Sequence, residues 1–246
     1  MMEQRTKIVK GMIDREMQTA NRANRDPIYI AWDEYNVWYR ARRGAAARGK
    51  NALEEKYNLE DALVIAEFLN AFIRNADVVK MANMAQLVNV IAPIFTNETG
   101  MFKQTIFYPL QLFANNVYGT SLNVFVDCKT YNTSKFFPGL GETTAQQIKV
   151  PYLDVSATYK DGELIICVVN RNKDESITTD IISQNGAFTG AFSVSEVNGP
   201  DIKSGNDFTK ENVKTVVKPS VNVSGAKFTY TFPPHSFTLV KGKISK

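Results

Sequence analysis

The segment that decides the fold runs from residue 27 to residue 39 and reads PIYIAWDEYNVWY. Its first six residues are almost entirely apolar, which is typical of a parallel strand covered on both faces. Two acids, Asp33 and Glu34, follow directly, and then come aromatic residues and Arg40. In parallel α/β architectures, active sites are built at the carboxyl ends of strands. The segment therefore predicts a parallel strand with a candidate site at its end.

Helices and strands alternate around this segment up to about residue 120. The expected elements are an amphipathic surface helix over 1–18, the strand at 27–32, a helix from 59 to about 75, a buried strand over 81–91 and a helix over 104–117. Asn58 can cap the middle helix, with Asp61 in its first turn. Pro109 must kink the last helix or mark its late start. This alternation indicates an open doubly wound sheet or a (β/α)8 barrel.

From about residue 121 the pattern changes to short strands separated by turns. The expected strands are 122–126, 155–159, 164–169, 192–194, 228–232 and 236–240. Lys160, Asp161 and Gly162 form a turn between the second and third of them. Short strands with turns between them predict an antiparallel β-sandwich. The sequence therefore predicts two domains, residues 1–120 and 121–246.

Composition narrows the classes of function. The chain has 246 residues, of which 44% are hydrophobic and 22% charged, as in ordinary globular proteins. No run approaches the roughly 18 apolar residues of a membrane span, and a net charge of +4 is too small to argue for nucleic acid. The single histidine, His235, excludes a multi-histidine metal site and is expected to be structural. Cys128 and Cys167 are expected to be buried and reduced, with a disulfide as the alternative.

The first region is too short for the barrel that its pattern suggests. A (β/α)8 barrel takes about 250 residues, and two parallel strands cannot close a barrel or cover their own edges. The chain begins within the first expected helix and shows no secretory leader. We therefore expect a fragment of a larger domain, with completion by another chain as the alternative, and the sequence assigns no compartment.

The charged residues near the strand allow a second interpretation. A basic cluster follows the strand and consists of Arg40, Arg42, Arg43, Arg48 and Lys50. Asp33 and Glu34 could pair with its first three arginines without any catalytic role. The cluster carries no interleaved aromatic residues and no nucleic-acid motif, so it favours a solvated loop over a nucleic-acid site. Spacing alone leaves the catalytic and the solvated-loop interpretations open.

Four stretches of the chain share their residues and order with one enzyme family. Residues 32–39 (WDEYNVWY) resemble the signature around the catalytic nucleophile of glycoside hydrolase family 51, the retaining α-L-arabinofuranosidases. Many members have tryptophan in place of Tyr35, which affects only the fine shape of the pocket. The family's last barrel strand, last barrel helix and closing strand are similar to residues 83–94 (NMAQLVNVIAPI), 104–109 (QTIFYP) and 233–238 (PPHSFT). The resemblance corresponds to the C-terminal half of a family member.

The resemblance implies a fold, a site and a reaction. The implied fold is the last part of a (β/α)8 barrel followed by a jelly-roll-like β-sandwich. Glu34 matches the nucleophile, Trp38 matches an aromatic residue that lines the arabinose subsite, and Gln86 matches a polar residue near the sugar. Asp33 and Asn36 match supporting positions. The implied reaction removes terminal α-L-arabinofuranosyl residues from arabinan or arabinoxylan fragments without a metal or organic cofactor. The implied partners are this saccharide and a second copy of the chain, since homo-oligomers are common in the family.

One part of the implied reaction is missing. Retaining glycosidases use two carboxyl groups roughly 5 Å apart, one as nucleophile and one as acid/base. The family's acid/base glutamate follows an asparagine on an earlier barrel strand, which would precede Met1. The one Asn-Glu pair of this chain, Asn97-Glu98, follows the last barrel strand and is expected to lie in a loop. The chain is therefore expected to be inactive by itself.

Two other functions remain as alternatives. The first is a non-catalytic carbohydrate-binding or scaffold module in which the β-sandwich is the functional part. Such a module has no need of a positioned nucleophile, so Glu34 beside Trp38 argues against it. The second is another retaining glycosidase of similar architecture, such as an endo-acting glucanase or a xylosidase, which the residues around Glu34 disfavour.

Overall fold

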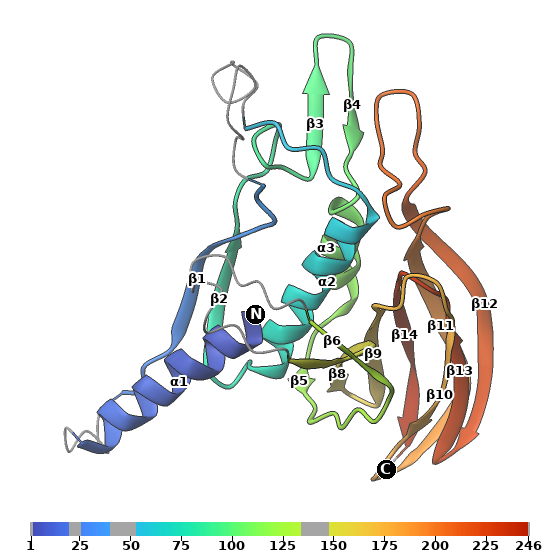
Figure 1. Ribbon diagram of the computed structural model, residues 1–246. Coiled ribbons are helices and arrows are strands. Elements are labelled where there is room, and N and C mark those ends of the chain that lie inside the picture. Colours follow the sequence, from blue (N-terminus) through green and yellow to red (C-terminus); the bar gives the residue numbers. More distant parts are fainter. Residues whose placement is uncertain (1, 20–25, 40–52, 134–147, 246) are drawn as a thin grey trace.

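A computed structural model describes residues 2–19, 26–39, 53–133 and 148–245 of the chain. A region of helices and two parallel strands lies beside a larger antiparallel β region (Figure 1). The described helices are α1 (Met2–Thr19), α2 (Leu59–Arg74) and α3 (Phe107–Asn116). None of them is long and apolar enough to cross a membrane.

The two parallel strands of the first region are β1 (Ile30–Tyr35) and β2 (Val79–Met84). Their parallel pairing confirms the prediction for this region, but two details were wrong. Ala31 and Met81 are exposed, so the strands are not covered on both faces. Their buried side chains all pack toward α2, which covers one face. The second expected strand is also shorter, because residues 85–93 leave the ladder as a loop.

β1 begins at Ile30 rather than at Pro27, and this shift matters for the candidate site. The strand also continues to Tyr35, so Asp33 and Glu34 lie inside it. The apolar run had predicted that they follow the strand. The run of apolar residues marked the start of the strand, while the strand itself continues past the acidic pair to Tyr35, which pairs with Met84.

Helix α2 begins where the sequence predicts. The Asn58 side chain accepts a hydrogen bond from the Asp61 amide, and the Asp61 carboxylate accepts one from the Asn58 amide at 2.8 Å. This capping box satisfies two backbone donors at the helix start. Helix α3 begins at Phe107, which places Pro109 in its first turn, where proline is tolerated. Both helix predictions are confirmed.

Helix α1 follows the expected bounds, but only part of its apolar stripe is buried. Ile13 packs against the cluster around β1 and β2, and Met17 is half-buried. Ile8 and Met12 are 58% and 65% exposed. The predicted surface helix is therefore present, with half of its apolar side chains facing solvent.

The β region is a sandwich with one large and one small layer. The large layer is an antiparallel sheet with the strand order β12-β11-β14-β9-β8-β5, and the small layer pairs β10 with β13. Large, mostly apolar side chains such as Phe188, Phe192 and Phe232 pack between the layers. The strand bounds are β5 (Thr120–Ser121), β8 (Leu153–Lys160), β9 (Glu163–Asn170), β10 (Ile177–Ile182), β11 (Ala187–Asn198), β12 (Lys214–Gly225), β13 (Lys227–Phe232) and β14 (Ser236–Ser245).

Two short hairpins complete the described strands. They are β3 (Ile94–Asn97) with β4 (Gly100–Lys103), and β6 (Thr130–Asn132) with β7 (Lys149–Pro151). The prediction of a strand over 122–126 was wrong. Its alternation is real, since Val124 packs on the core and Phe125 is 91% exposed, but the segment leaves the edge of β8 after Leu122.

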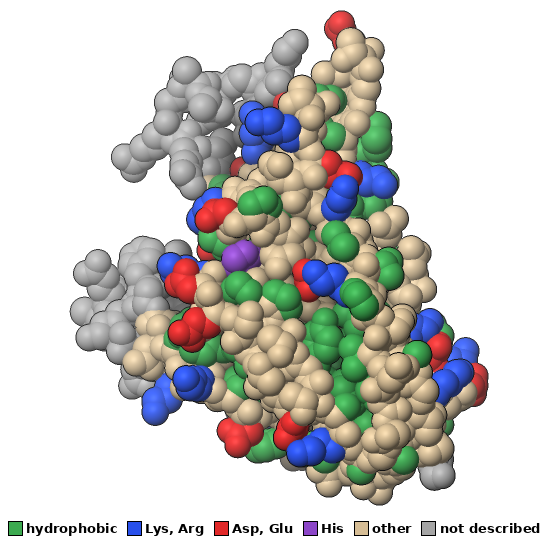
Figure 2. All heavy atoms as spheres, turned by 90° about the vertical axis from the view of Figure 1, so that its right-hand side faces the viewer, with side chains coloured by type: hydrophobic (Ala, Val, Ile, Leu, Met, Phe, Trp, Pro, Cys, Tyr) green, Lys and Arg blue, Asp and Glu red, His purple; other side chains and the backbone are tan. Residues whose placement is uncertain are grey.

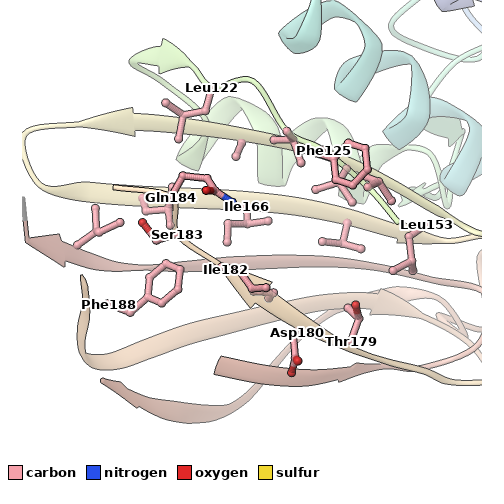
Figure 3. A pocket seen from close by; sticks show the side chains of 18 of the residues that line it. Leu122, Phe125, Leu153, Ile166, Thr179, Asp180, Ile182, Ser183, Gln184 and Phe188 are labelled. Atoms are coloured by element: carbon pink, nitrogen blue, oxygen red, sulfur yellow. The ribbon is translucent and has the colours of Figure 1, made fainter. Parts of the chain in front are cut away.

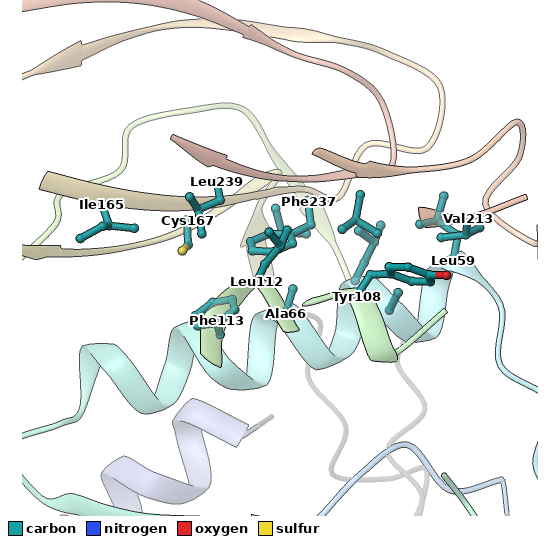
Figure 4. Close-up of a cluster of buried hydrophobic side chains, with 14 residues drawn as sticks. Leu59, Ala66, Tyr108, Leu112, Phe113, Ile165, Cys167, Val213, Phe237 and Leu239 are labelled. Carbon is teal, nitrogen blue, oxygen red and sulfur yellow. The ribbon is translucent and has the colours of Figure 1, made fainter. Parts of the chain in front are cut away.

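Helix α2 lies between the two regions and is buried on two sides. Ile65 and Phe72 face β1 and β2, whereas Leu59, Leu63 and Ala66 face the large sheet. A helix that is apolar on opposite sides is expected to be covered on both. Figure 4 shows the side chains of α2 and α3 meeting those of β9 and β14 in one cluster. The two regions therefore share a hydrophobic core.

A network of buried charges lies beside this core. Asp154, only 7% exposed, accepts hydrogen bonds from Arg74, Arg171 and Asn70 at 2.8–3.1 Å. Arg171 also donates to Glu67 at 2.7 Å, and burial together with the Asp154 charge raises the pKa of Glu67 against the opposing effect of Arg171. The network links α2 to the first strands of the large sheet.

Candidate active site

A bulge in β1 presents the acidic pair. Between Trp32 and Tyr35 the register shifts by one residue relative to β2, so Asp33 and Glu34 lie in the extra length. A bulge bends the strand locally and re-aims its side chains. Both carboxylates are exposed, whereas Tyr35 is buried. The strand therefore turns the candidate nucleophile toward solvent at its carboxyl end.

Aromatic packing anchors the strand on the other side. The Tyr35 ring lies edge-on to Phe72 with centroids 5.0 Å apart and edge-on to Phe68 at 6.4 Å. The Trp32 ring lies 6.1 Å from that of Phe72. Because Tyr35 and Trp32 belong to β1 and the phenylalanines belong to α2, this packing fixes the position of the strand that carries Glu34 relative to the helix.

This packing predicts a specific pH dependence. Burial raises the pKa of Tyr35 to about 12, compared with about 10 for an exposed tyrosine. The stability contributed by the neutral phenol is therefore complete below about pH 10 and is lost as the pH rises toward 12. In the parent chain, ionisation of Tyr35 should lower the free energy of unfolding by about 2–3 kcal/mol between about pH 9 and pH 12. In Tyr35→Phe this part of the decrease should be absent, as measured by urea unfolding at each pH.

The exposed Tyr29 provides the matched control for this measurement. It is 50% exposed, so Tyr29→Phe removes a phenol without touching the packing against α2. This control is expected to keep the pH dependence of the parent chain. If Tyr35→Phe followed the same curve as the parent, the linkage of Tyr35 to alkaline unfolding would be refuted.

Asn36 joins the ends of the two parallel strands. Its side-chain amide donates to the Ala85 carbonyl oxygen at 2.7 Å and also to that of Ile91. The Ala85 amide in turn donates to the Tyr35 carbonyl oxygen at 3.2 Å. Gln86 follows Ala85 directly, through a cis peptide bond, and is exposed. The structure thus brings the Gln86 segment beside the end of the strand that carries Glu34.

Trp38 lies just beyond this junction and is 51% exposed. The peptide groups on its two sides are bonded to residues 55–57: the Tyr57 hydroxyl donates to the Val37 carbonyl oxygen at 2.6 Å, and the Tyr39 amide donates to Glu55 Oε1 at 3.1 Å. Sequence reasoning missed Tyr57 and Glu55. The only signal was that Tyr57 directly precedes the helix cap Asn58, a position that is often apolar and buried.

The Asn-Glu pair lies in a turn, as predicted. Asn97 ends β3, and Glu98 is exposed in the turn before β4. The Asn97 side-chain oxygen accepts hydrogen bonds from the backbone amides of Thr99 and Gly100, each at 2.9 Å. The Asn97 side chain therefore holds the turn of the hairpin.

The histidine and the two cysteines of the chain lie apart from the candidate site. No group of three or more histidine, cysteine, aspartate or glutamate side chains is arranged there to hold a metal ion. His235 lies in the turn before β14, where its Nδ1 lies 2.6 Å from the Lys173 carbonyl oxygen. Cys128 and Cys167 are both free, and burial raises the pKa of Cys167.

Charged side chains do not segregate on the face shown in Figure 2. Acidic and basic side chains are interspersed there, with hydrophobic side chains between them. A nucleic-acid site would instead need a continuous basic surface. The basic cluster of Arg40, Arg42, Arg43, Arg48 and Lys50 lies outside the described residues.

A large hollow lies inside the sandwich, away from Glu34. This cavity of about 1590 Å³ is bounded by the large sheet, by β10 and by the segment after β5 (Figure 3). Aliphatic side chains such as Leu122, Leu153 and Ile166 dominate its lining, and Asp180 is among its polar residues. Thr179, Ser183 and Gln184 add further hydrogen-bonding groups to the lining (Figure 3). The candidate-site residues Glu34, Trp38 and Gln86 are not among the residues that line this cavity.

Three comparisons place the chain among known proteins. An α-L-arabinofuranosidase C of Aspergillus clavatus, described as probable, is 38% identical over 219 residues, covering 87% of this chain and 39% of that protein. An intracellular exo-α-(1→5)-L-arabinofuranosidase of Bacillus subtilis is 31% identical, covering 91% of this chain and 44% of that protein. An α-L-arabinofuranosidase from Thermotoga maritima, solved with arabinose, superposes with a TM-score of 0.79 at 27% identity, covering 98% of this chain and 47% of that one.

Residues 33–236 match the family model of the α-L-arabinofuranosidase C-terminal domain, a span that contains Glu34, Trp38 and Gln86. The chain belongs to this family. The match confirms the resemblance to glycoside hydrolase family 51. The chain spans about two fifths of the length of the curated relatives that it matches.

Proposed function

We propose that this chain carries the nucleophile of a retaining α-L-arabinofuranosidase that releases terminal arabinofuranose from arabinan or arabinoxylan fragments. The observation that carries the proposal is the junction at the ends of β1 and β2. There, the bulge exposes Glu34 while Asn36 bonds to Ala85 and Ile91, so that Gln86 lies close to the acidic strand end. The names of the relatives support arabinofuranose as the sugar.

The proposed reaction is a double displacement. The Glu34 carboxylate attacks the anomeric carbon, the bond to the leaving oxygen breaks, and an acid gives that oxygen a proton. The product of this step is an arabinosyl ester on Glu34. Water then attacks the same carbon and loses a proton to the acid's conjugate base, which releases arabinose and frees the Glu34 carboxylate.

The acid/base in this proposal comes from outside the chain. A retaining mechanism needs a second carboxyl group about 5 Å from the nucleophile. The Asn97 side chain is hydrogen-bonded to the backbone of the hairpin turn, and Glu98 is exposed in that turn. The pair is therefore a poor candidate for this role. We assign the acid/base to the part of the relatives' length that this sequence does not span.

The proposal extends to the fold. In it, residues 1–120 form the last strands and helices of a (β/α)8 barrel, and residues 121–246 form the C-terminal sandwich. The exposed faces of β1 and β2 and the exposed side chains Ile8 and Met12 support this view, because further barrel strands and helices would cover them.

An activated substrate tests the nucleophile without the acid. 2,4-Dinitrophenolate leaves without proton donation, so 2,4-dinitrophenyl α-L-arabinofuranoside needs only the attacking carboxylate in the first step. We expect the chain to release a single burst of dinitrophenolate and to retain one arabinosyl group, without turnover of 4-nitrophenyl α-L-arabinofuranoside. Mass spectrometry of the tryptic peptide of residues 26–40 should locate the group on Glu34.

Matched variants separate Glu34 from its neighbours. Glu34→Gln should abolish labelling, whereas Asp33→Asn and Glu98→Gln should still be labelled. Labelling at another residue, labelling of Glu34→Gln, or a folded chain that takes up no sugar would each argue against Glu34 as a competent nucleophile. Sustained turnover that Glu98→Gln abolishes would show that the hairpin pair supplies the acid after all.

A further inference from the structure

Trp38 lies between two peptide groups that are both held by one short stretch of chain. The Tyr57 hydroxyl bonds to the carbonyl before Trp38, and the Glu55 carboxylate bonds to the amide after it. Peptide groups are rigid planes, so the only soft backbone rotations between these two bonds are φ and ψ of Trp38 itself. Bonds to both groups therefore limit the direction in which the indole leaves the backbone.

The stretch that holds Trp38 is itself fixed by a buried glutamine. Gln104 is 1% exposed, and its side chain accepts a hydrogen bond from the Tyr57 amide at 2.9 Å. The same side chain donates to the carbonyl oxygens of Glu55 and Ala92 at 2.9 and 2.8 Å. Tyr57 is 2% exposed, so its hydroxyl reaches Val37 from a packed position.

A third bond ties this segment to the start of α2. The Tyr39 hydroxyl donates to the carboxylate of Asp61, which is 1% exposed and closes the helix capping box. Burial, together with the neighbouring Asp61 charge, raises the pKa of Tyr39, so its hydroxyl stays a donor at neutral pH. The residue that follows Trp38 is thus anchored to a helix that also packs against β1.

We propose that Tyr57 and Glu55 are positioning residues for sugar recognition, because they hold the Trp38 indole where it can stack on the arabinofuranosyl ring presented to Glu34. This inference rests on the proposed function, in which Trp38 lines the sugar subsite. Neither residue is expected to touch the sugar; both act through the backbone on the two sides of Trp38.

The first measurement follows the mobility and solvent accessibility of the Trp38 indole. The chain has two tryptophans, so Trp32→Phe leaves Trp38 as the only one and keeps a ring against Phe72. In this background, Tyr57→Phe and Glu55→Ala should each increase the fast motion of Trp38 in fluorescence anisotropy decay and its quenching by acrylamide. Glu55→Gln keeps an oxygen acceptor and should restore the background values.

The second measurement reads sugar binding separately from chemistry. The rate of Glu34 labelling is measured against the concentration of 2,4-dinitrophenyl α-L-arabinofuranoside. One lost hydrogen bond should raise the half-saturating concentration about 2–10-fold in Tyr57→Phe. The maximal labelling rate should stay that of the background protein, because the strand that carries Glu34 is anchored separately, by the packing of Tyr35 on Phe72.

Tyr108→Phe is the matched control for both measurements. Tyr108 is, like Tyr57, a buried tyrosine whose hydroxyl donates a hydrogen bond. Its acceptor is the Glu211 carboxylate, and its ring lies in the core shared with the sandwich. It should change neither the motion of Trp38 nor the half-saturating concentration. Equal effects of Tyr57→Phe and Tyr108→Phe would reduce the role of Tyr57 to general stability and overturn the inference.

The two failures are distinguishable. If Glu34 is labelled and the half-saturating concentration is the same in Tyr57→Phe as in the background, the positioning role fails while the proposed function stands. If Trp38 becomes more mobile but the background protein is not labelled at all, the proposed function fails, and the inference about sugar recognition fails with it.

Discussion

Asp154→Ala is expected to lower the free energy of unfolding by about 3–5 kcal/mol, because it leaves a buried ion network without its central carboxylate. Both oxygens of Asp154 are in use: one accepts from Asn70 and Arg74, and the other from Arg74 and Arg171. The side chains of Arg74 and Arg171 are 19% and 15% exposed, so water can replace the lost partner only in part. Urea unfolding at neutral pH measures the loss.

An exposed aspartate provides the control for this prediction. Asp180 pairs with Lys227 at 3.1 Å, but the two side chains are 43% and 58% exposed. Asp180→Ala should leave the unfolding midpoint close to that of the parent chain, since exposed ion pairs add little. Asp154→Asn, which keeps the shape and one acceptor, should fall between the two. Equal stability of the Asp154 and Asp180 alanine variants would contradict the role given to the buried network.

Phe237→Ala is expected to cost about 3–5 kcal/mol of stability, because it opens a cavity in the core that both regions share. Phe237 is fully buried, and its ring stacks on that of Phe113 with centroids 5.4 Å apart. Phe113 belongs to α3 and Phe237 to β14, so the lost contact spans the two regions. Urea unfolding should show the loss as a lower midpoint.

The shared core also predicts how the chain unfolds. Tryptophan fluorescence reports on β1 and the residues after it, whereas far-ultraviolet circular dichroism reports on the helices and strands of both regions. The two signals should change together in the parent chain. Phe125→Ala removes the same side chain from a position that is 91% exposed and should not shift either signal. A midpoint for Phe125→Ala as low as that of Phe237→Ala would refute the assignment of the loss to the core.

Local signals in the sequence predicted the elements that depend on neighbours along the chain. The Asn58 cap with Asp61 marked the start of α2, and Asp161-Gly162 marked the hairpin of β8 and β9, where both residues have positive φ. These features need only a few consecutive residues. They could be predicted because the physical cause of each lies within a single turn of chain.

Among the strands that escaped prediction, β12 and β10 did so for a reason that the sheet order explains. β12 contains Pro219, which argues against a strand because proline lacks the amide that a ladder needs. The structure places β12 at the edge of the large sheet, where proline is tolerated. β10 belongs to the two-stranded layer, where it has a single partner strand, β13. An edge position is a property of the whole sheet and leaves little trace in the strand itself.

The candidate site likewise has a part that the sequence predicted and a part that only the folded chain shows. The residues around Glu34 pointed to the acidic strand end and to Trp38 from sequence alone. The bulge at Asp33 and Glu34 depends on the register against β2, and the hold on Trp38 depends on residues 55–57. Neither relation is encoded by spacing along the chain, so both required the folded arrangement.

The place of β14 in the large sheet has a consequence for synthesis on the ribosome. β14 pairs with β11 on one side and with β9 on the other, so residues 236–245 form the middle of the sheet. Until these residues leave the exit tunnel, the strands made before them exist only as two separate pieces, β12 with β11 and β9 with β8 and β5. The nascent chain therefore exposes two unpaired strand edges until β14 arrives, and such edges are sites of aggregation.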